Sequence, residues 1–181
     1  MGIVNRLHHL MHNVVTGINQ GYQPVSGYNY GAKNYGRVRE ATKFVAVSAT
    51  IIKIFVSIVT FLFAEQLITF FRADDPAVIE FGTLALRLTC LTAPLMGIYT
   101  AASTSYQSTG RSFLAFSLSF VRQGFLYIPM MLILPNFIGA LGIQLVTPLT
   151  DLICAIISFP FYIRFLREMK RLEREKQENV V

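Results

Sequence analysis

Four long apolar stretches dominate this sequence and restrict what the chain can fold into. Each has at least 21 residues and a single charged side chain. About 20 apolar residues cross a bilayer as an α-helix, and a helix satisfies its own backbone hydrogen bonds there. We therefore expect membrane-spanning helices over residues 44–64, 81–106, 113–134 and 138–163.

A fifth stretch, residues 7–31, has no Lys, Arg, Asp or Glu but is more polar than the others. With it, the sequence predicts an all-α, polytopic membrane helix bundle of about five transmembrane helices. Charged residues make up only 14% of the chain, whereas about a quarter is usual in a soluble domain. The 15 Phe and 8 Tyr exclude a disordered chain, and the 2 Cys exclude a disulfide scaffold.

The charges of the connecting loops predict an orientation. The first loop, the third loop and the tail are basic, the second loop is acidic, and the fourth has no charge. Because positively charged loops stay in the cytoplasm, we expect the N-terminus outside and a charged cytoplasmic tail over 166–181. Because the basic residues behind the net charge of +6 lie in these loops and in the tail, nucleic-acid binding is not expected. The predicted location is a bacterial inner (cell) membrane, crossed several times.

Two expectations concern the ends of the chain. An N-terminus outside with no signal peptide before it suggests that a preceding segment is missing. In the tail, Glu168 and Glu173 precede basic residues at helical spacing, which predicts local ion pairs on an exposed helix.

The stretch from Gly17 to Lys33 is the most informative part of the sequence. It contains four glycines and several side-chain amides, and Pro24 frees one backbone carbonyl. Buried amides need hydrogen-bond partners, which favours a bent helix that faces a polar cavity. The alternative is close helix packing, because glycines four residues apart let two helices approach.

This stretch also carries a resemblance to a known family. Its Gln23-Pro24 and the run from Tyr28 to Lys33 resemble the multidrug and toxic compound extrusion (MATE) transporters. The resemblance continues in the same order through four further groups of residues: Pro94; Tyr106, Gln107 and Gly110; Arg122, Gln123 and Pro129; Gly142 and the run from Pro148 to Asp151.

The resemblance implies a fold and a function. MATE proteins have about a dozen helices in two lobes around a central cavity. This chain would be most of the C-terminal lobe, over residues 1–165, as a fragment of the transporter. The whole protein would export small cationic amphipathic drugs in exchange for H+ or Na+, without a further cofactor. Alternating access needs both lobes, so we expect the chain to be inactive without its N-terminal lobe.

Several polar residues are candidates for the substrate cavity: Gln20, Gln23, Asn29, Tyr99 and Gln107. Four prolines inside predicted spans are candidates for helix bends: Pro24, Pro94, Pro129 and Pro148. The resemblance implies no coupling residue here. The aspartate that many bacterial members use lies in the absent lobe, and the span over 81–106 has no acid beyond Glu80 at its mouth.

Asp151 is the only acid deep inside a predicted span, and Arg122 lies inside another. A carboxylate at membrane depth is costly without a partner. Asp151 is therefore either a cation or proton site or the partner of Arg122 or Lys53. We expect no metal site, because a zinc site needs three or four ligands and the histidines near the N-terminus have no matching cluster.

Two other classes of function stay open beside the exporter. One is a non-catalytic half-transporter subunit that needs a partner lobe. The other is a small intramembrane enzyme, which would need paired acids or a His–acid cluster at membrane depth. Only Asp151 meets that requirement, so we do not expect an enzyme.

Overall fold

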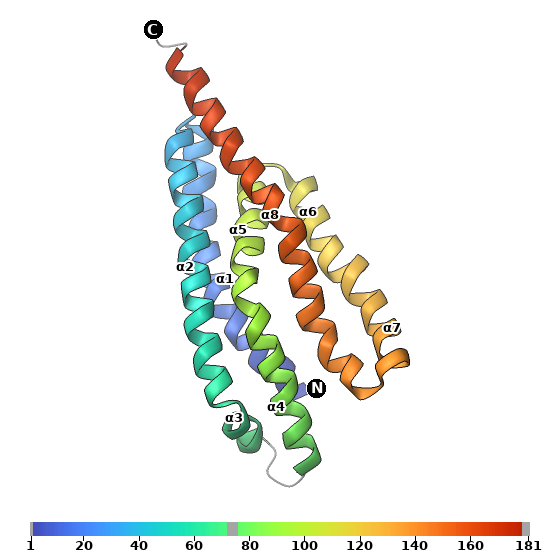
Figure 1. The fold of residues 1–181 in the computed structure, drawn as a ribbon. Coiled ribbons are helices and arrows are strands. Elements are labelled where there is room, and N and C mark those ends of the chain that lie inside the picture. Colours follow the sequence, from blue (N-terminus) through green and yellow to red (C-terminus); the bar gives the residue numbers. More distant parts are fainter. Residues whose placement is uncertain (1, 72–75, 179–181) are drawn as a thin grey trace.

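The computed structural model describes residues 2–71 and 76–178, and within them the chain is a bundle of helices (Figure 1). Its elements are α1 (Gly2–Gly31), α2 (Tyr35–Leu62), α3 (Ala64–Phe71), α4 (Pro76–Thr92), a 3-10 turn (Ala93–Leu95), α5 (Met96–Ser108), α6 (Ser112–Phe120), a π-helical segment (Val121–Tyr127), α7 (Ile128–Ile138) and α8 (Ala140–Glu178). The prediction of an all-α bundle is confirmed.

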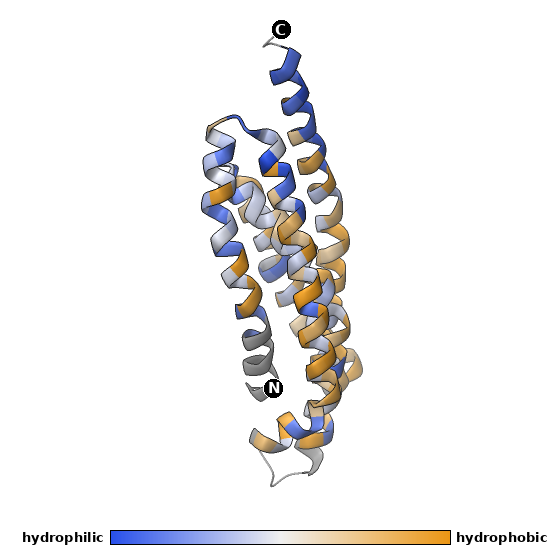
Figure 2. Cartoon of the chain, turned by 90° about the vertical axis from the view of Figure 1, so that its left-hand side faces the viewer, coloured by the Kyte–Doolittle hydropathy of each residue, from blue (hydrophilic) through white to orange (hydrophobic). Residues whose placement is uncertain are grey.

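Within the described residues, four helical rods are long and apolar enough to cross a membrane. They are Tyr35–Leu62, Ile79–Ser108, Ser112–Ile138 and Leu141–Glu178. The second rod joins α4 to α5 through the 3-10 turn at Pro94, and the third joins α6 to α7 through the π-helical segment. The helix α1 has 30 residues and lies beside them, but its amides and glycines make it more hydrophilic (Figure 2).

The core consists of small and aromatic side chains between the rods. The largest cluster joins α2, α5, α6 and α8 through Val38, Met96, Tyr99, Tyr106, Ala115, Leu118, Cys154, Phe165 and Met169. The Tyr106 and Phe165 rings meet edge to face with 5.3 Å between their centroids, and the Tyr106 hydroxyl donates to the Phe161 carbonyl at 3.0 Å. These contacts hold α8 against α5.

A tight turn reverses the chain between α7 and α8. Gly139 has a φ of 64°, a conformation that residues with a Cβ rarely adopt. Three residues later, a Cβ on Gly142 would collide with the backbone of Leu134 and Pro135. Two glycines thus let the start of α8 lie directly against the end of α7.

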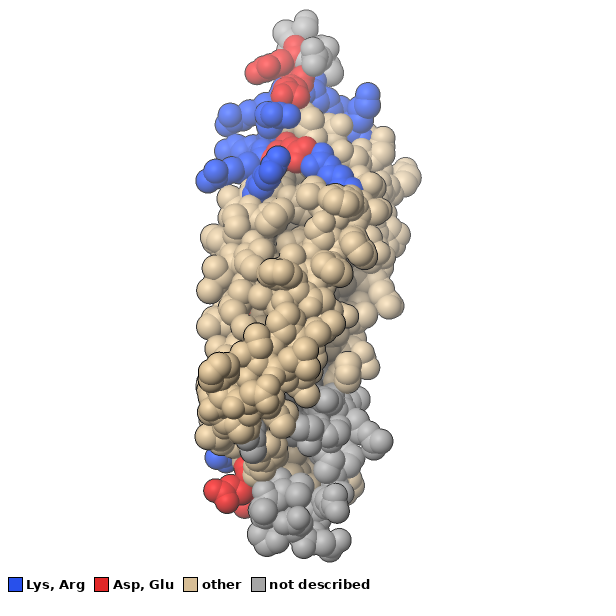
Figure 3. All heavy atoms as spheres, turned by 90° about the vertical axis from the view of Figure 1, so that its right-hand side faces the viewer, with Lys and Arg blue, Asp and Glu red and all other residues tan. Residues whose placement is uncertain are grey.

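The outer surface of the bundle is apolar over most of its length. Phe44, Phe55, Phe113 and Phe125 are each more than 60% exposed, as lipid-facing side chains would be. Lys and Arg gather at the end where α8 extends beyond the other helices, with a wide uncharged zone next to them (Figure 3). This distribution fits a chain that crosses a membrane.

The helix α8 continues without a break through Glu178, and its far end is held by ion pairs to other elements. Glu168 pairs with Arg111, and Glu173 pairs with Arg39 at 3.2 Å. The expectation that these two acids pair within the tail is wrong for the described residues. Both lie on the inner side of α8, where arginines of the bundle are within reach.

Candidate functional site

A polar seam joins α1 to α2 and α5. The Tyr22 hydroxyl is 2.7 Å from the Thr42 hydroxyl and 2.8 Å from the Ser105 hydroxyl. One turn further along, Ser108 donates to the Ser26 hydroxyl at 3.0 Å. These hydrogen bonds are made between side chains of different helices, which is how polar residues hold helices together where water is scarce.

At the edge of this seam, the Gln23 amide donates to the Gln107 side-chain oxygen at 3.2 Å. The two residues are 84 positions apart, and both belong to the set of cavity candidates. Gln107 is exposed and Gln23 is half-buried. The amide pair is therefore reachable from outside the bundle.

The remaining cavity candidates lie elsewhere. Gln20 is exposed on α1, and the Asn29 amide donates to the Val25 carbonyl of its own helix at 2.8 Å. Tyr99 is buried on the other side of α5, next to Arg122. The structure therefore brings Gln23 and Gln107 together but leaves Tyr99 in a separate, charged cluster.

One face of α1 is open to its surroundings. Gly17, Gln20, Gly21, Pro24, Tyr28 and Gly31 are all exposed and follow one another at helical spacing. No atom lies within 4 Å of a Cβ built on Gly17, Gly21 or Gly31. Only Gly27 has a close neighbour, with its Cβ position 3.2 Å from the Ser108 carbonyl oxygen. Close packing against the described helices thus explains Gly27 but not the other three.

A buried ion pair lies in the middle of the bundle. The Arg122 Nη2 atom donates to Asp151 Oδ1 at 3.0 Å, and Asp151 is 1% exposed. The other carboxylate oxygen, Oδ2, has no hydrogen-bond partner in the part of the chain that the structure describes. The Arg122 guanidinium also lies over the Tyr99 ring, 5.4 Å from its centroid.

The π-helical segment positions Arg122 for this pair. Val121–Tyr127 interrupts the α-helical register between α6 and α7, and it contacts α8. A π-helical turn widens the helix and turns side chains to new directions, and such turns are common at functional sites. Sequence reasoning did not find this segment, because nothing in its composition marks it.

A second buried cation lies close to the pair. Lys53 of α2 is 5% exposed and interacts electrostatically with both Asp151 and Arg122. One carboxylate thus lies among two cations, which leaves the cluster with an excess positive charge. Arg87, by contrast, is exposed and lies over the Phe61 ring, 5.4 Å from its centroid.

A cavity of about 390 Å³ opens onto this ion pair. It is lined by His9, His12, Arg122, Gln123, Tyr127, Thr147 and Asp151. His12 interacts electrostatically with Asp151. Sequence reasoning considered these histidines only as metal ligands, whereas the structure places them beside an ion pair from two other helices. No group of three or more His, Cys, Asp and Glu that would suit a metal occurs in the described residues.

The four bend candidates lie in different local structures. Pro24 and Pro148 are inside the continuous helices α1 and α8. Pro94 is in the 3-10 turn between α4 and α5, and Pro129 is the second residue of α7, just beyond the π-helical segment. Two of the four thus lie at breaks in α-helical geometry.

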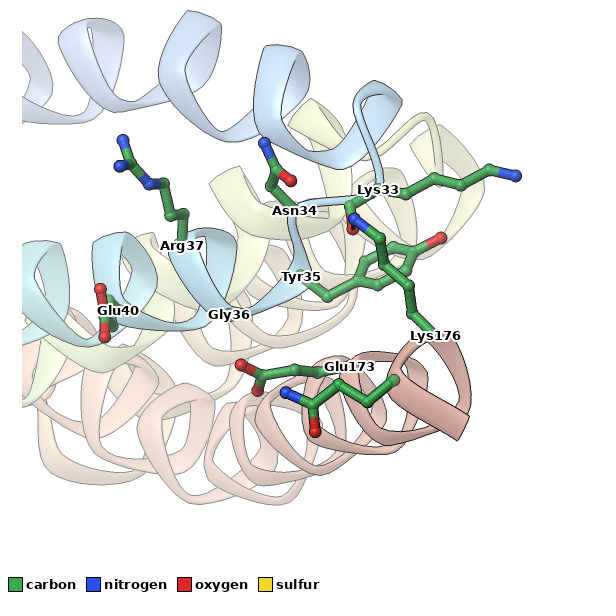
Figure 4. Close-up of a pocket in the computed structure, with 9 residues that line it drawn as sticks. Lys33, Asn34, Tyr35, Gly36, Arg37, Glu40, Glu173 and Lys176 are labelled. Atoms are coloured by element: carbon green, nitrogen blue, oxygen red, sulfur yellow. Dashed lines mark hydrogen bonds between the residues drawn. The ribbon is translucent and has the colours of Figure 1, made fainter. Parts of the chain in front are cut away.

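A larger, open hollow lies at the basic end, between the α1–α2 connection and α8 (Figure 4). Its volume is about 870 Å³. Glu173 points from α8 towards Gly36, and the Lys176 ammonium donates to the Lys33 carbonyl at 3.1 Å. This hollow is surrounded by contacts that fix the end of α8.

Beyond the apolar part of α8, the Arg111 guanidinium holds the pKa of Glu168 below its usual range.

The MatE family model matches residues 1–133, which is most of the chain. The chain belongs to the MATE family. This agrees with the resemblance seen in the motifs around Gln23 and Gln107. It also makes the chain part of a multi-pass membrane transporter family rather than an enzyme family.

Curated members of the MATE family resemble the chain at moderate identity. The multidrug export protein MepA of Staphylococcus aureus (strain N315) is 27% identical over 157 residues, covering 87% of this chain and 34% of that protein. MepA of Staphylococcus haemolyticus (strain JCSC1435) is 24% identical over 173 residues, covering 96% and 37%. The chain thus spans about a third of the length of these relatives.

Solved MATE structures share the fold. The bent form of the Vibrio cholerae transporter VcmN superposes with a TM-score of 0.83, covering 94% of this chain and 39% of that one at 19% identity. An outward-facing multidrug resistance MATE transporter gives 0.85, with 94% and 38% covered at 19% identity. The bundle described above is therefore part of the MATE fold.

Proposed function

We infer that this chain supplies the C-terminal lobe of a secondary active exporter, in which cationic amphipathic drugs leave the cell in exchange for H+ or Na+. Membership of the MATE family supports this proposal, as do the MepA relatives, which are named multidrug export proteins. The second lobe, which would close the transport path, is required in addition.

The open face of α1 is the observation that carries the proposal. Its exposed amides and glycine backbone are unsuitable for contact with lipid, where polar groups find no partners. They suit a water-filled cavity between this lobe and another. In this proposal α1 is the first of five spans, with the N-terminus outside and the C-terminus in the cytoplasm.

Within that cavity we assign drug contact to Gln20, Gln23 and Gln107. Amides orient a ligand without carrying a charge that would repel a cation. The Gln23–Gln107 hydrogen bond is accessible from outside the bundle, so a drug can take the place of either partner. Asn29 borders this surface, and Tyr99 belongs to the charged cluster, where its ring already faces Arg122.

The Asp151–Arg122 pair has a structural role in this proposal. The Asp151 carboxylate is 1% exposed and already bound by the Arg122 guanidinium, so it is unsuited to direct contact with a transported drug. The pair ties α8 to the π-helical segment instead. Pro24, Pro94, Pro129 and Pro148 are the positions at which helices bend during alternating access.

A chimera tests the proposal. The third of S. aureus MepA that matches this chain is replaced by the chain itself, and ethidium efflux is measured in bacteria that lack their own drug pumps. We expect efflux from the chimera and none from the 181-residue chain alone. A chimera that is produced at the level of MepA, is monodisperse and yet exports no ethidium would overturn the proposal.

The second candidate function is a half-transporter subunit whose partner lobe is a separate chain. Co-expression of the chain with a separate N-terminal part of MepA distinguishes the two. Efflux from the unlinked pair would support a two-chain exporter.

A further inference from the structure

One face of α8 is apolar in its first part and basic further along. Leu152, Ile156 and Phe159 are 39%, 65% and 52% exposed, respectively. Further along, the exposed residues are basic: Arg164, Arg167, Lys170, Arg171 and Arg174. We call these five the basic stripe. Helical spacing puts the stripe on the same side of α8 as the three apolar residues, so one continuous face is first apolar and then cationic.

Two acids of the same segment are turned towards the bundle and away from this face. Glu168 pairs with Arg111 and Glu173 pairs with Arg39, so both carboxylates are used by other helices of the bundle. Among the described residues, one ion pair lies on the outer side of this segment, between Arg171 and Glu175 at 3.3 Å. Basic and acidic residues nearly balance in number in this part of the sequence, but the fold turns two of the acids inward and leaves the outer face basic.

The dimensions of this face match one leaflet of a bilayer. From Leu152 to Ile163, α8 rises by about 17 Å, and half of a hydrocarbon core is about 15 Å thick. Arg164 then lies at the edge of the core. Arg167 and Arg171 follow within about 10 Å along the helix, and long arginine side chains reach back towards the head groups.

We propose that this face of α8 is a binding site for an anionic phospholipid, with acyl chains along Leu152 to Phe159 and the phosphate head group on the basic stripe. Arginine is suited to this role because its guanidinium binds phosphate oxygens in pairs. The site is separate from the polar face of α1 and does not depend on the export function proposed above.

The chain has no Trp, so a single introduced tryptophan reports on its own surroundings. Phe159→Trp places one at the proposed site, and Phe55→Trp places one on the exposed face of α2 as a reference. Each protein is reconstituted with brominated dioleoyl phosphatidylglycerol or brominated dioleoyl phosphatidylcholine mixed with the unlabelled lipid. Bromine quenches the nearby fluorophore, which gives the relative affinity of the two lipids at each position.

At position 159 we expect phosphatidylglycerol to be preferred by about fivefold or more, since one basic residue near the surface contributes about that factor. At position 55 the preference should be near one. The triple variant Arg164→Gln, Arg167→Gln, Arg171→Gln should lose the preference at position 159. High salt should weaken it as well.

The matched control is Lys33→Gln, Arg37→Gln, Lys176→Gln, which removes three cations that line the hollow at the basic end. It should keep the preference within about twofold, although it changes the net charge equally. Equal preference at positions 55 and 159, or equal loss in both triple variants, would overturn the proposal, because either result means a general charge effect. No preference at any position would also overturn it and would favour a soluble acidic partner. Helicity and elution volume verify that each variant is folded.

Discussion

Arg122 and Asp151 meet through a hydrogen bond of 3.0 Å in the middle of the bundle, although 29 residues separate them in the sequence. The pair joins the π-helical segment to α8, and Lys53 of α2 lies near enough to act on both electrostatically. Three elements thus meet at one buried carboxylate.

Removing one partner of this pair should be strongly destabilising. Asp151→Asn leaves the buried Arg122 and Lys53 without their carboxylate, and Arg122→Gln removes the hydrogen-bonded partner of Asp151; each should cost about 3–5 kcal/mol. The triple variant Lys53→Met, Arg122→Met, Asp151→Leu should lose less, because it removes the carboxylate together with both neighbouring cations. Unfolding in detergent micelles measures all three, and a single variant as stable as the wild type would contradict the structural role of the pair.

The hydroxyl of Tyr22 should contribute measurably to the contact of α1 with α2 and α5. Tyr22→Phe removes the group that meets both Thr42 and Ser105 and leaves the ring in place. We expect a loss of about 1 kcal/mol in the free energy of unfolding. Tyr28→Phe is the control, because Tyr28 is 77% exposed and should tolerate the change without loss.

Gly142 should not tolerate a side chain. A Cβ there would overlap the backbone of Leu134, so Gly142→Ala forces α7 and α8 apart at a cost of about 1–3 kcal/mol. Gly17→Ala, with no atom within 4 Å of the new Cβ, serves as the matched comparison and should be neutral or slightly stabilising. Equal stability of the two variants would refute the close approach at the α7–α8 turn.

The Arg111–Glu168 pair should make the end of α8 sensitive to acid. Because the folded-state pKa of Glu168 is lowered, its contribution is present above the ordinary glutamate pKa of about 4.3 and disappears as the pH falls through the lower value. The protection of the α8 backbone near residue 168 against hydrogen exchange, corrected for the intrinsic pH dependence of the exchange rate, should fall over that range. In Glu168→Gln, exchange should already be fast at neutral pH and should not respond to acid through this group.

In a complete exporter, Gln23→Leu should weaken drug export without changing the amount of protein. The substitution keeps the size of the side chain but removes the amide that meets Gln107. Ethidium efflux per molecule in the MepA chimera measures the effect. Full efflux at equal expression would remove Gln23 from the proposed drug cavity, and Gln66→Leu, exposed on α3, is the control.

Much of the architecture was predictable, because hydropathy acts over long stretches. The apolar runs around Lys53, Arg87, Arg122 and Asp151 each coincide with a helical rod. The motifs around Gln23 and Gln107 were enough for the resemblance that the family match bears out. Hydropathy and motif signals extend over many residues, so a single charged residue inside an apolar run does not hide them.

Contacts that depend on the direction in which a side chain points were not predictable. Helical spacing favoured local pairs for Glu168 and Glu173, but it contains no information about Arg111 and Arg39, which approach from distant parts of the chain. The separation of Tyr99 from Gln23 has the same origin, since Gln23 of α1 meets Gln107 at the end of α5, whereas Tyr99 lies about two turns earlier on α5, beside Arg122. The π-helical segment shifts the register by a fraction of a turn, which no composition reveals.

The helix α8 is continuous over its whole length, so a tilt deep in the bundle would displace its far end. Its 39 residues extend over about 58 Å, and Asp151 divides it unequally, with about 40 Å between that residue and Glu178. Once the pairs to Arg111 and Arg39 are released, a tilt of only about 10° around the buried carboxylate would therefore swing the far end through about 7 Å. A small rearrangement deep in the bilayer would thus be amplified into a displacement at the surface large enough for a spin label or a fluorescent pair to record.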